Sequence, residues 1–124
     1  MSSPAVNFRH VKAIALAVTD LDRAMHFYTD TLSLPPAFEE GKQVGNKLGN
    51  AVLLFKTDWY AQPSDALNPR VTIETDDARG TEAALRARGV SISDPVESYG
   101  ESQIGSFLDS EGNKLWFCSG PGPS

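Results

Sequence analysis

Two hydrophobic patterns, one typical of a strand and one typical of a helix, follow each other in the stretch Ile14-Ala-Leu-Ala-Val-Thr-Asp-Leu-Asp-Arg-Ala-Met-His-Phe-Tyr28. Residues 11–18 form an apolar run, which is typical of a buried strand. After Thr19-Asp20, apolar side chains recur at helical spacing, and either of these two residues can cap the free amides of a helix. Pro35-Pro36 cannot continue a helix. We therefore predict a strand over 11–18 and a helix over about 21–33.

The same order of elements returns later in the chain. Arg70-Val-Thr-Ile-Glu-Thr75 alternates polar and apolar side chains as a strand does, and Asp76-Asp77 then opens a helix that ends at Gly89. Each helix is followed by short strand-like pieces, and each half closes on a similar Gly-Asn strand, over 49–55 and 112–118. One unit of strand, helix and three strands thus occurs twice.

The length and the composition fit one packed domain. The chain has 124 residues, of which 40% are hydrophobic and 22% charged, so it can bury a core without disulfides. Turn-forming residues mark the connection between the halves and the C-terminal end. We expect a single domain over 1–124, with module one at about 11–57, a linker at about 58–69, module two at about 70–119 and a frayed tail at 120–124.

The charge and the cysteine content exclude several classes of partner and compartment. The net charge is -5 and the eleven Lys and Arg residues do not cluster, so we expect no nucleic acid or anionic membrane partner. No apolar run has the length of a signal peptide or a membrane span. Cys118 is the only cysteine, which excludes an intrachain disulfide and favours a reducing, cytoplasmic location.

Two motifs carry a resemblance to a known family. One is the stretch 14–28, and the other is the hairpin Asp109-Ser-Glu-Gly-Asn-Lys-Leu-Trp-Phe117. In this order and spacing, the chain resembles the vicinal-oxygen-chelate superfamily, which includes glyoxalase, bleomycin-resistance and extradiol-dioxygenase proteins. The resemblance implies an α+β fold of two βαβββ modules, with curved mixed sheets that form a cup and with helices outside. It also implies a homodimer with two equivalent sites.

The resemblance further implies where a metal would be held. Metal-dependent members place His, Glu, His and Glu on four strands of the cup, seven residues before the helix-capping Asp and four after the hairpin Gly. In this sequence those positions hold Ala13, Leu53, Arg70 and Trp116. None of them offers the lone pairs that a divalent metal needs. The sequence also shows no phosphate loop or dinucleotide fingerprint, so we expect neither a metal nor another cofactor.

Strand alternation predicts which side chains face the cup. The guanidinium of Arg70 suits a carboxylate or phosphate, or else forms a salt bridge to Glu74 or to an acidic partner residue. Trp116 either stacks on a ligand or packs in a dimer interface, and Trp59 in the linker either lines the pocket or covers the edge of the core. The candidate ligand-binding residues are Ala13, Leu53, Phe55, Arg70, Thr72, Trp116, Cys118, Trp59 and Tyr99.

These features favour binding over turnover. No catalytic triad is visible, and Glu74 is the candidate general base. Our first hypothesis is metal-independent binding of a small hydrophobic or aromatic molecule in the cup, as in the antibiotic-sequestering members of the superfamily. The alternative is an isomerase or lyase of the glyoxalase or dioxygenase type. Such an enzyme would use a carboxylate base without metal, or metal ligands that the spacing does not reveal.

Overall fold

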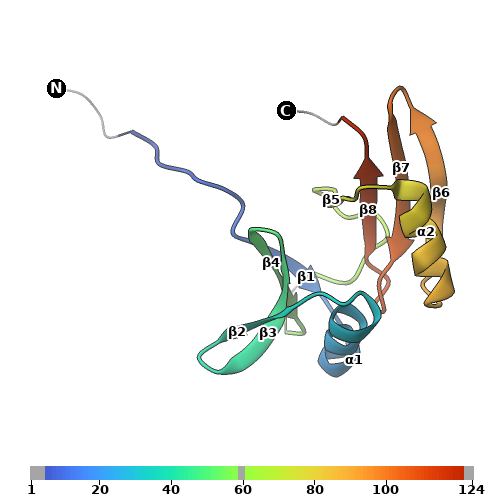
Figure 1. Ribbon diagram of the computed structural model, residues 1–124. Coiled ribbons are helices and arrows are strands. Elements are labelled where there is room, and N and C mark those ends of the chain that lie inside the picture. Colours follow the sequence, from blue (N-terminus) through green and yellow to red (C-terminus); the bar gives the residue numbers. More distant parts are fainter. Residues whose placement is uncertain (1–4, 59–60, 122–124) are drawn as a thin grey trace.

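The computed structural model describes residues 5–58 and 61–121 and contains two similar modules (Figure 1). Module one consists of β1 (Ala13–Ala17), α1 (Leu21–His26), the π-helical segment η1 (Phe27–Thr31), β2 (Pro36–Glu39), β3 (Lys42–Leu48) and β4 (Ala51–Lys56). Module two consists of β5 (Thr72–Glu74), α2 (Ala78–Ala87), β6 (Ile92–Tyr99), β7 (Ser102–Leu108) and β8 (Lys114–Ser119). The predicted α+β fold with two βαβββ modules is confirmed.

Each module contains a mixed, four-stranded sheet. The strand orders are β1-β4-β3-β2 and β5-β8-β7-β6. In both sheets the first strand of the module lies parallel to the last, and the other neighbours are antiparallel. A parallel pair needs a long crossover connection, which the helix and the intervening strands provide in each module. The repeat in the sequence is therefore also a repeat in topology.

Both helices begin at an aspartate, and for the first helix the structure selects Asp20 over Thr19, the other cap that the sequence allows. Asp20 accepts a hydrogen bond from the Arg23 amide at 3.0 Å, and Asp77 accepts one from the Gly80 amide at 3.1 Å. The helix predicted over 21–33 is shorter, because α1 changes into the π-helical segment after His26. No helix in the described part of the chain is long and apolar enough to cross a membrane.

One hydrophobic core joins the two modules. Phe27 of module one stacks on Phe107 of module two, with ring centroids 6.5 Å apart. Leu53 from β4 and Phe117 from β8 belong to the same cluster of buried side chains. We call the side of each sheet that packs into this cluster its core face, and the opposite side its open face. The core faces of both sheets pack into this cluster, and the hollows on the two open faces are lined separately, one by module one and the other by module two.

Candidate functional site

The pairing of β1 with β4 shows which residues of module one lie on the core face. Ile14 pairs with Leu53, whose side chain is fully buried. Phe55 lies on the same face and stacks on Tyr28, with ring centroids 4.9 Å apart. Side chains of paired residues point to the same side of a sheet. The sequence prediction that Leu53 and Phe55 line the cup is therefore wrong.

The error comes from a difference in turn length between the modules. β3 and β4 are joined by the two residues Gly49-Asn50, whereas β7 and β8 are joined by the five residues 109–113. Leu53 and Trp116 each lie four residues after a glycine, Gly49 and Gly112. Because the turns differ in length, the two residues nevertheless lie on opposite faces of their sheets, since a shift of one residue reverses the face of a strand. Leu54, and not Leu53, is the residue on β4 that corresponds to Trp116 on β8.

The open face of module one forms an apolar hollow. Its volume is about 430 Å³, and Ala13 is one of its lining residues. Its only charged lining residues in the described part of the chain are Lys12 and Glu39. The hollow offers a surface for an apolar ligand and contains few polar or reactive groups. Its other lining residues are Ala37, Phe38, Val44, Val52 and Leu54.

The open face of module two carries Trp116 together with two cations. The Cζ atom of Arg70 lies 4.0 Å from the centroid of the Trp116 ring, and the Nζ atom of Lys114 lies 4.7 Å from it. Both distances are within the range of cation–π attraction. Trp116 is half-buried, because its neighbours Leu115 and Phe117 point into the core while its own ring points outward.

The two cations differ in how their charge is balanced. Lys114 forms a salt bridge with Asp94, with 2.5 Å between Nζ and Oδ2. The hydrogen bonds from Lys114 and Ser106 outweigh burial and hold the pKa of Asp94 below its usual value. Arg70 is exposed and forms no salt bridge with any described residue, so the alternative of an Arg70–Glu74 pair is not seen. Arg70 therefore presents an available guanidinium beside a flat aromatic ring.

A crevice of about 110 Å³ lies next to Trp116 on this face. It is lined by Asp94, Pro95, Glu97, Tyr99, Ile104 and Trp116. Thr72 pairs with Trp116, and Glu74 pairs with Cys118, so these residues share the open face. The predicted residues that the structure brings to one sheet face are thus Arg70, Thr72, Glu74, Tyr99, Trp116 and Cys118. Trp59 lies outside the described residues.

The positions that hold metal in the resembling family do not suit a metal here. Ala13, Arg70 and Trp116 lack oxygen or neutral imidazole donors, and Leu54 in place of Leu53 changes nothing in this respect. Within residues 5–58 and 61–121, no three His, Cys, Asp or Glu side chains are close enough to hold a metal ion. The donor set of the family's metal centre is absent from these positions.

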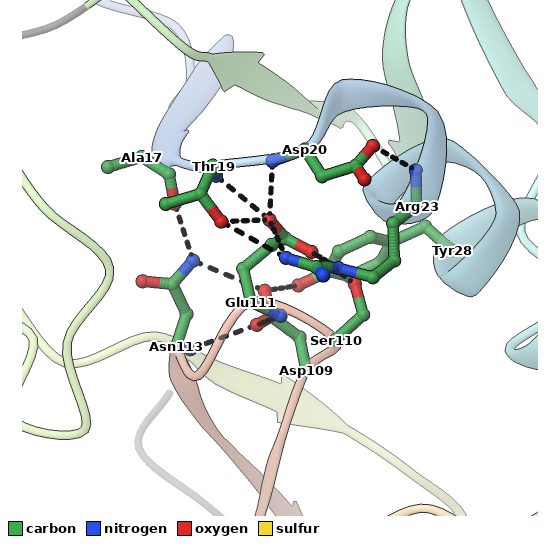
Figure 2. A network of polar contacts seen from close by, with 9 residues as sticks. All are labelled: Ala17, Thr19, Asp20, Arg23, Tyr28, Asp109, Ser110, Glu111 and Asn113. Atoms are coloured by element: carbon green, nitrogen blue, oxygen red, sulfur yellow. Dashed lines mark hydrogen bonds and ion pairs between the residues drawn. The ribbon is translucent and has the colours of Figure 1, made fainter.

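A polar network that the sequence prediction missed fixes the β7–β8 hairpin against module one (Figure 2). The fully buried carboxylate of Glu111 accepts hydrogen bonds from the backbone amides of Thr19 and Asp20, both at 2.8 Å. It also forms a salt bridge with Arg23, with 2.7 Å between Nε and Oε2. Burial alone would raise the pKa of Glu111, but these donors and Ser110 lower it from 4.5 to about 2.

Asp109 forms the second half of this network (Figure 2). The buried hydroxyl of Tyr28 donates to Asp109 Oδ2 at 2.7 Å, and the side-chain amide of Asn113 donates to the Ala17 carbonyl at 2.8 Å. Burial, and then the Asp109 charge, raise the pKa of Tyr28 well above 10. Because β8 follows this hairpin directly, the network sets the position of Trp116 relative to module one. The signal in the sequence was the acidic hairpin motif together with Arg23 in the first helix.

Comparison with known proteins agrees with this architecture. The family model of the glyoxalase/bleomycin resistance protein/dioxygenase superfamily matches residues 10–117. TnmS3, an antibiotic-binding protein from Streptomyces sp. CB03234, has a similar structure, with a TM-score of 0.75 and 22% identity over 94% of this chain and 100% of that chain. Lactoylglutathione lyase from Agrobacterium tumefaciens gives a TM-score of 0.69 and 22% identity over 90% and 93% of the two chains.

A third similar structure is a superfamily member from Sphaerobacter thermophilus DSM 20745, with a TM-score of 0.75 and 19% identity over 90% of this chain and 98% of that chain. No curated protein matches the sequence. At these identities the solved structures establish the fold, while the family model covers most of the chain. The chain therefore belongs to the glyoxalase/bleomycin resistance protein/dioxygenase superfamily.

Proposed function

We propose that this protein binds a small planar, hydrophobic or aromatic molecule without a metal, and that Trp116 and Arg70 contact the ligand. The observation that carries the proposal is the exposed Arg70 guanidinium held 4.0 Å from the half-buried Trp116 ring on an open sheet face. An aromatic wall with a few polar groups is the usual composition of a small-molecule site. The existence of an antibiotic-binding protein with the same fold is compatible with this proposal.

We further propose that two chains complete the cup. The crevice beside Trp116 measures about 110 Å³, which is well below the roughly 300–1,000 Å³ of a typical ligand pocket. The apolar hollow of module one measures about 430 Å³, but Trp116 of the same chain does not line it. In a symmetric homodimer, module one of one chain would cover module two of the other, and each of the two sites would have an apolar wall and a Trp116–Arg70 wall.

A fluorescence titration tests the ligand proposal. In a Trp59→Phe background, which leaves Trp116 as the single tryptophan, 2-naphthoate and its neutral amide should quench fluorescence saturably. Arg70→Ala should weaken naphthoate binding by about tenfold and the amide much less, because only the carboxylate loses a charged partner. Arg79→Ala, in an exposed arginine on α2, serves as the matched control. Linear quenching by both compounds, or equal effects of the two arginine variants, would contradict the proposal.

Elemental analysis tests the metal-independent part. The purified protein should contain no zinc, nickel, iron or manganese in stoichiometric amount, because the four positions of the family's metal centre hold no suitable donors. Quenching by 2-naphthoate should also be unchanged after treatment with a chelator. One tightly bound metal per chain, with binding lost on chelation, would show that other residues hold a metal and would favour the enzymatic alternative.

A further inference from the structure

A third hollow lies between the two modules, and we call it the inter-module hollow. Its volume is about 350 Å³, and residues of both modules line it. Leu32, Leu34 and Leu48 belong to its wall in module one, and Phe107 and Phe117 belong to its wall in module two. Phe107 is 3% exposed and Phe117 is 2% exposed. The hollow therefore reaches down to side chains of the shared core.

The inter-module hollow is separate from the surfaces considered above for ligand binding. It shares no lining residue with the crevice beside Trp116 or with the open-face hollow of module one. Phe117 follows Trp116 on β8, and neighbouring side chains of a strand point to opposite faces of the sheet. A molecule in the inter-module hollow would thus contact β8 from the face opposite to Trp116.

The lining of the inter-module hollow suits a molecule without charge. Among the described residues Glu74 is its only charged lining residue, and Glu74 pairs with Cys118, so its side chain points to the open face. The other lining residues are aliphatic, aromatic or hydroxyl-bearing. A charged ligand would lose its hydration here without gaining a charged partner. The hollow therefore selects for a neutral, mainly apolar molecule.

Two hydroxyl groups supply the polar part of this lining. Thr75 directly follows β5, and Thr81 lies on α2. Their Oγ1 atoms are 2.6 Å apart, so one hydroxyl donates a hydrogen bond to the other. The pair then keeps one O–H donor and several acceptor lone pairs. A ligand hydroxyl can bind this pair while the rest of the ligand contacts leucine and phenylalanine side chains.

We propose that the inter-module hollow is a second binding site, which takes a neutral ring compound of the size of an alkylphenol, with its hydroxyl group on the Thr75–Thr81 pair. The volume of about 350 Å³ lies within the roughly 300–1,000 Å³ of small-molecule pockets. Core cavities lined by leucine and phenylalanine bind small aromatic molecules such as benzene. The proposal goes beyond the function proposed above, because this site does not include Trp116 or Arg70.

Isothermal titration calorimetry of the full chain with 4-ethylphenol and with ethylbenzene tests the role of the hydroxyl pair. The double variant Thr75→Val/Thr81→Val should weaken 4-ethylphenol binding about fivefold, because one neutral hydrogen bond is lost. The same variant should leave ethylbenzene binding unchanged, because valine has a shape similar to that of threonine. If neither compound binds, or if the double variant weakens both compounds equally, the proposal is wrong.

A substitution that fills the hollow tests the location. Leu34→Trp should weaken the binding of both compounds at least tenfold, because the larger side chain occupies their space. Leu67→Trp is the matched control, since Leu67 is also half-buried against the core but does not line the hollow. Circular dichroism checks that both variants fold, and if Leu34→Trp does not, Leu48→Trp in the same wall takes its place.

Two results of this second experiment would overturn the proposal. One is binding of 4-ethylphenol that is equally strong in the hollow-filling variant and in Leu67→Trp, which would place the compound elsewhere. The other is a loss of self-association in the hollow-filling variant alone, measured by sedimentation velocity, which would show that a second copy of the chain covers the hollow.

Discussion

Replacing Glu111 by alanine is expected to lower the free energy of unfolding by about 3 kcal/mol, since several hydrogen bonds to a buried carboxylate and its ion pair with the half-exposed Arg23 are lost together. The substitution leaves the amides of Thr19 and Asp20 and the guanidinium of Arg23 without their common acceptor. These groups lie in module one, so the loss also loosens the contact between the modules. Urea denaturation followed by circular dichroism measures the change.

The control is Asp65→Ala, which removes an exposed carboxylate from the segment between the modules. A surface substitution of this kind changes stability by roughly 0.5 kcal/mol or less. If Glu111→Ala lowered the free energy of unfolding equally little, the network in Figure 2 would stabilise the fold no more than water stabilises the same groups in the unfolded chain. Glu111→Gln should lie between the two, because it keeps one acceptor oxygen and loses the charge.

The same residue gives the stability a defined pH dependence. The pKa of Glu111 is lowered from 4.5 to about 2, so its contribution is fully present above pH 4.5 and is lost as the pH falls toward 2. A shift of this size corresponds to about 3 kcal/mol. The difference in unfolding free energy between the unmodified protein and Glu111→Gln should therefore shrink across this window. A difference that stays constant from neutral pH to pH 2 would contradict the lowered pKa.

Features that depend on neighbouring residues could be predicted from the sequence. The helix start at Asp20 is a local signal, because the capping side chain and the amide that it binds are three residues apart. The two modules followed from the repetition of such signals, and their topology agrees with the structure. Arg70 and Trp116 could be placed on one face by alternation, because β5 and β8 lie side by side in parallel register.

Two features could not be derived in this way. Which side chains of β4 face the core depends on the length of the turn before this strand. With the two-residue turn at Gly49-Asn50, the alternation of core-facing and open-facing residues is shifted by one residue relative to that in module two. The contact between Glu111 and Arg23 joins residues 88 positions apart and follows no periodic pattern. Such a contact depends on how the modules pack on each other, and this packing is set by the shared core rather than by either motif alone.

A matched pair of substitutions in adjacent residues tests the face of β4. Leu53→Ala should lower the free energy of unfolding by about 3–4 kcal/mol, because it opens a cavity in the core that the surrounding side chains cannot fill. Leu54→Ala should lower it by about 1 kcal/mol or less, because Leu54 is half-buried and faces a hollow that already exists. Denaturation of the two variants under the same conditions measures the difference directly.

Substitutions at Leu53 and Leu54 also distinguish an effect on stability from an effect on ligand binding. If Leu54 lines the cup, Leu54→Ala should change the affinity for 2-naphthoate while the protein stays folded. A conservative Leu53→Met should leave that affinity unchanged, because Leu53 lies on the core face. The reverse pattern, with Leu54 essential for folding and Leu53 changing only the affinity, would mean that the register of β1 with β4 is shifted by one residue. Ala13 would then pair with a neighbour of Val52, and the open face of β4 would have to be assigned again.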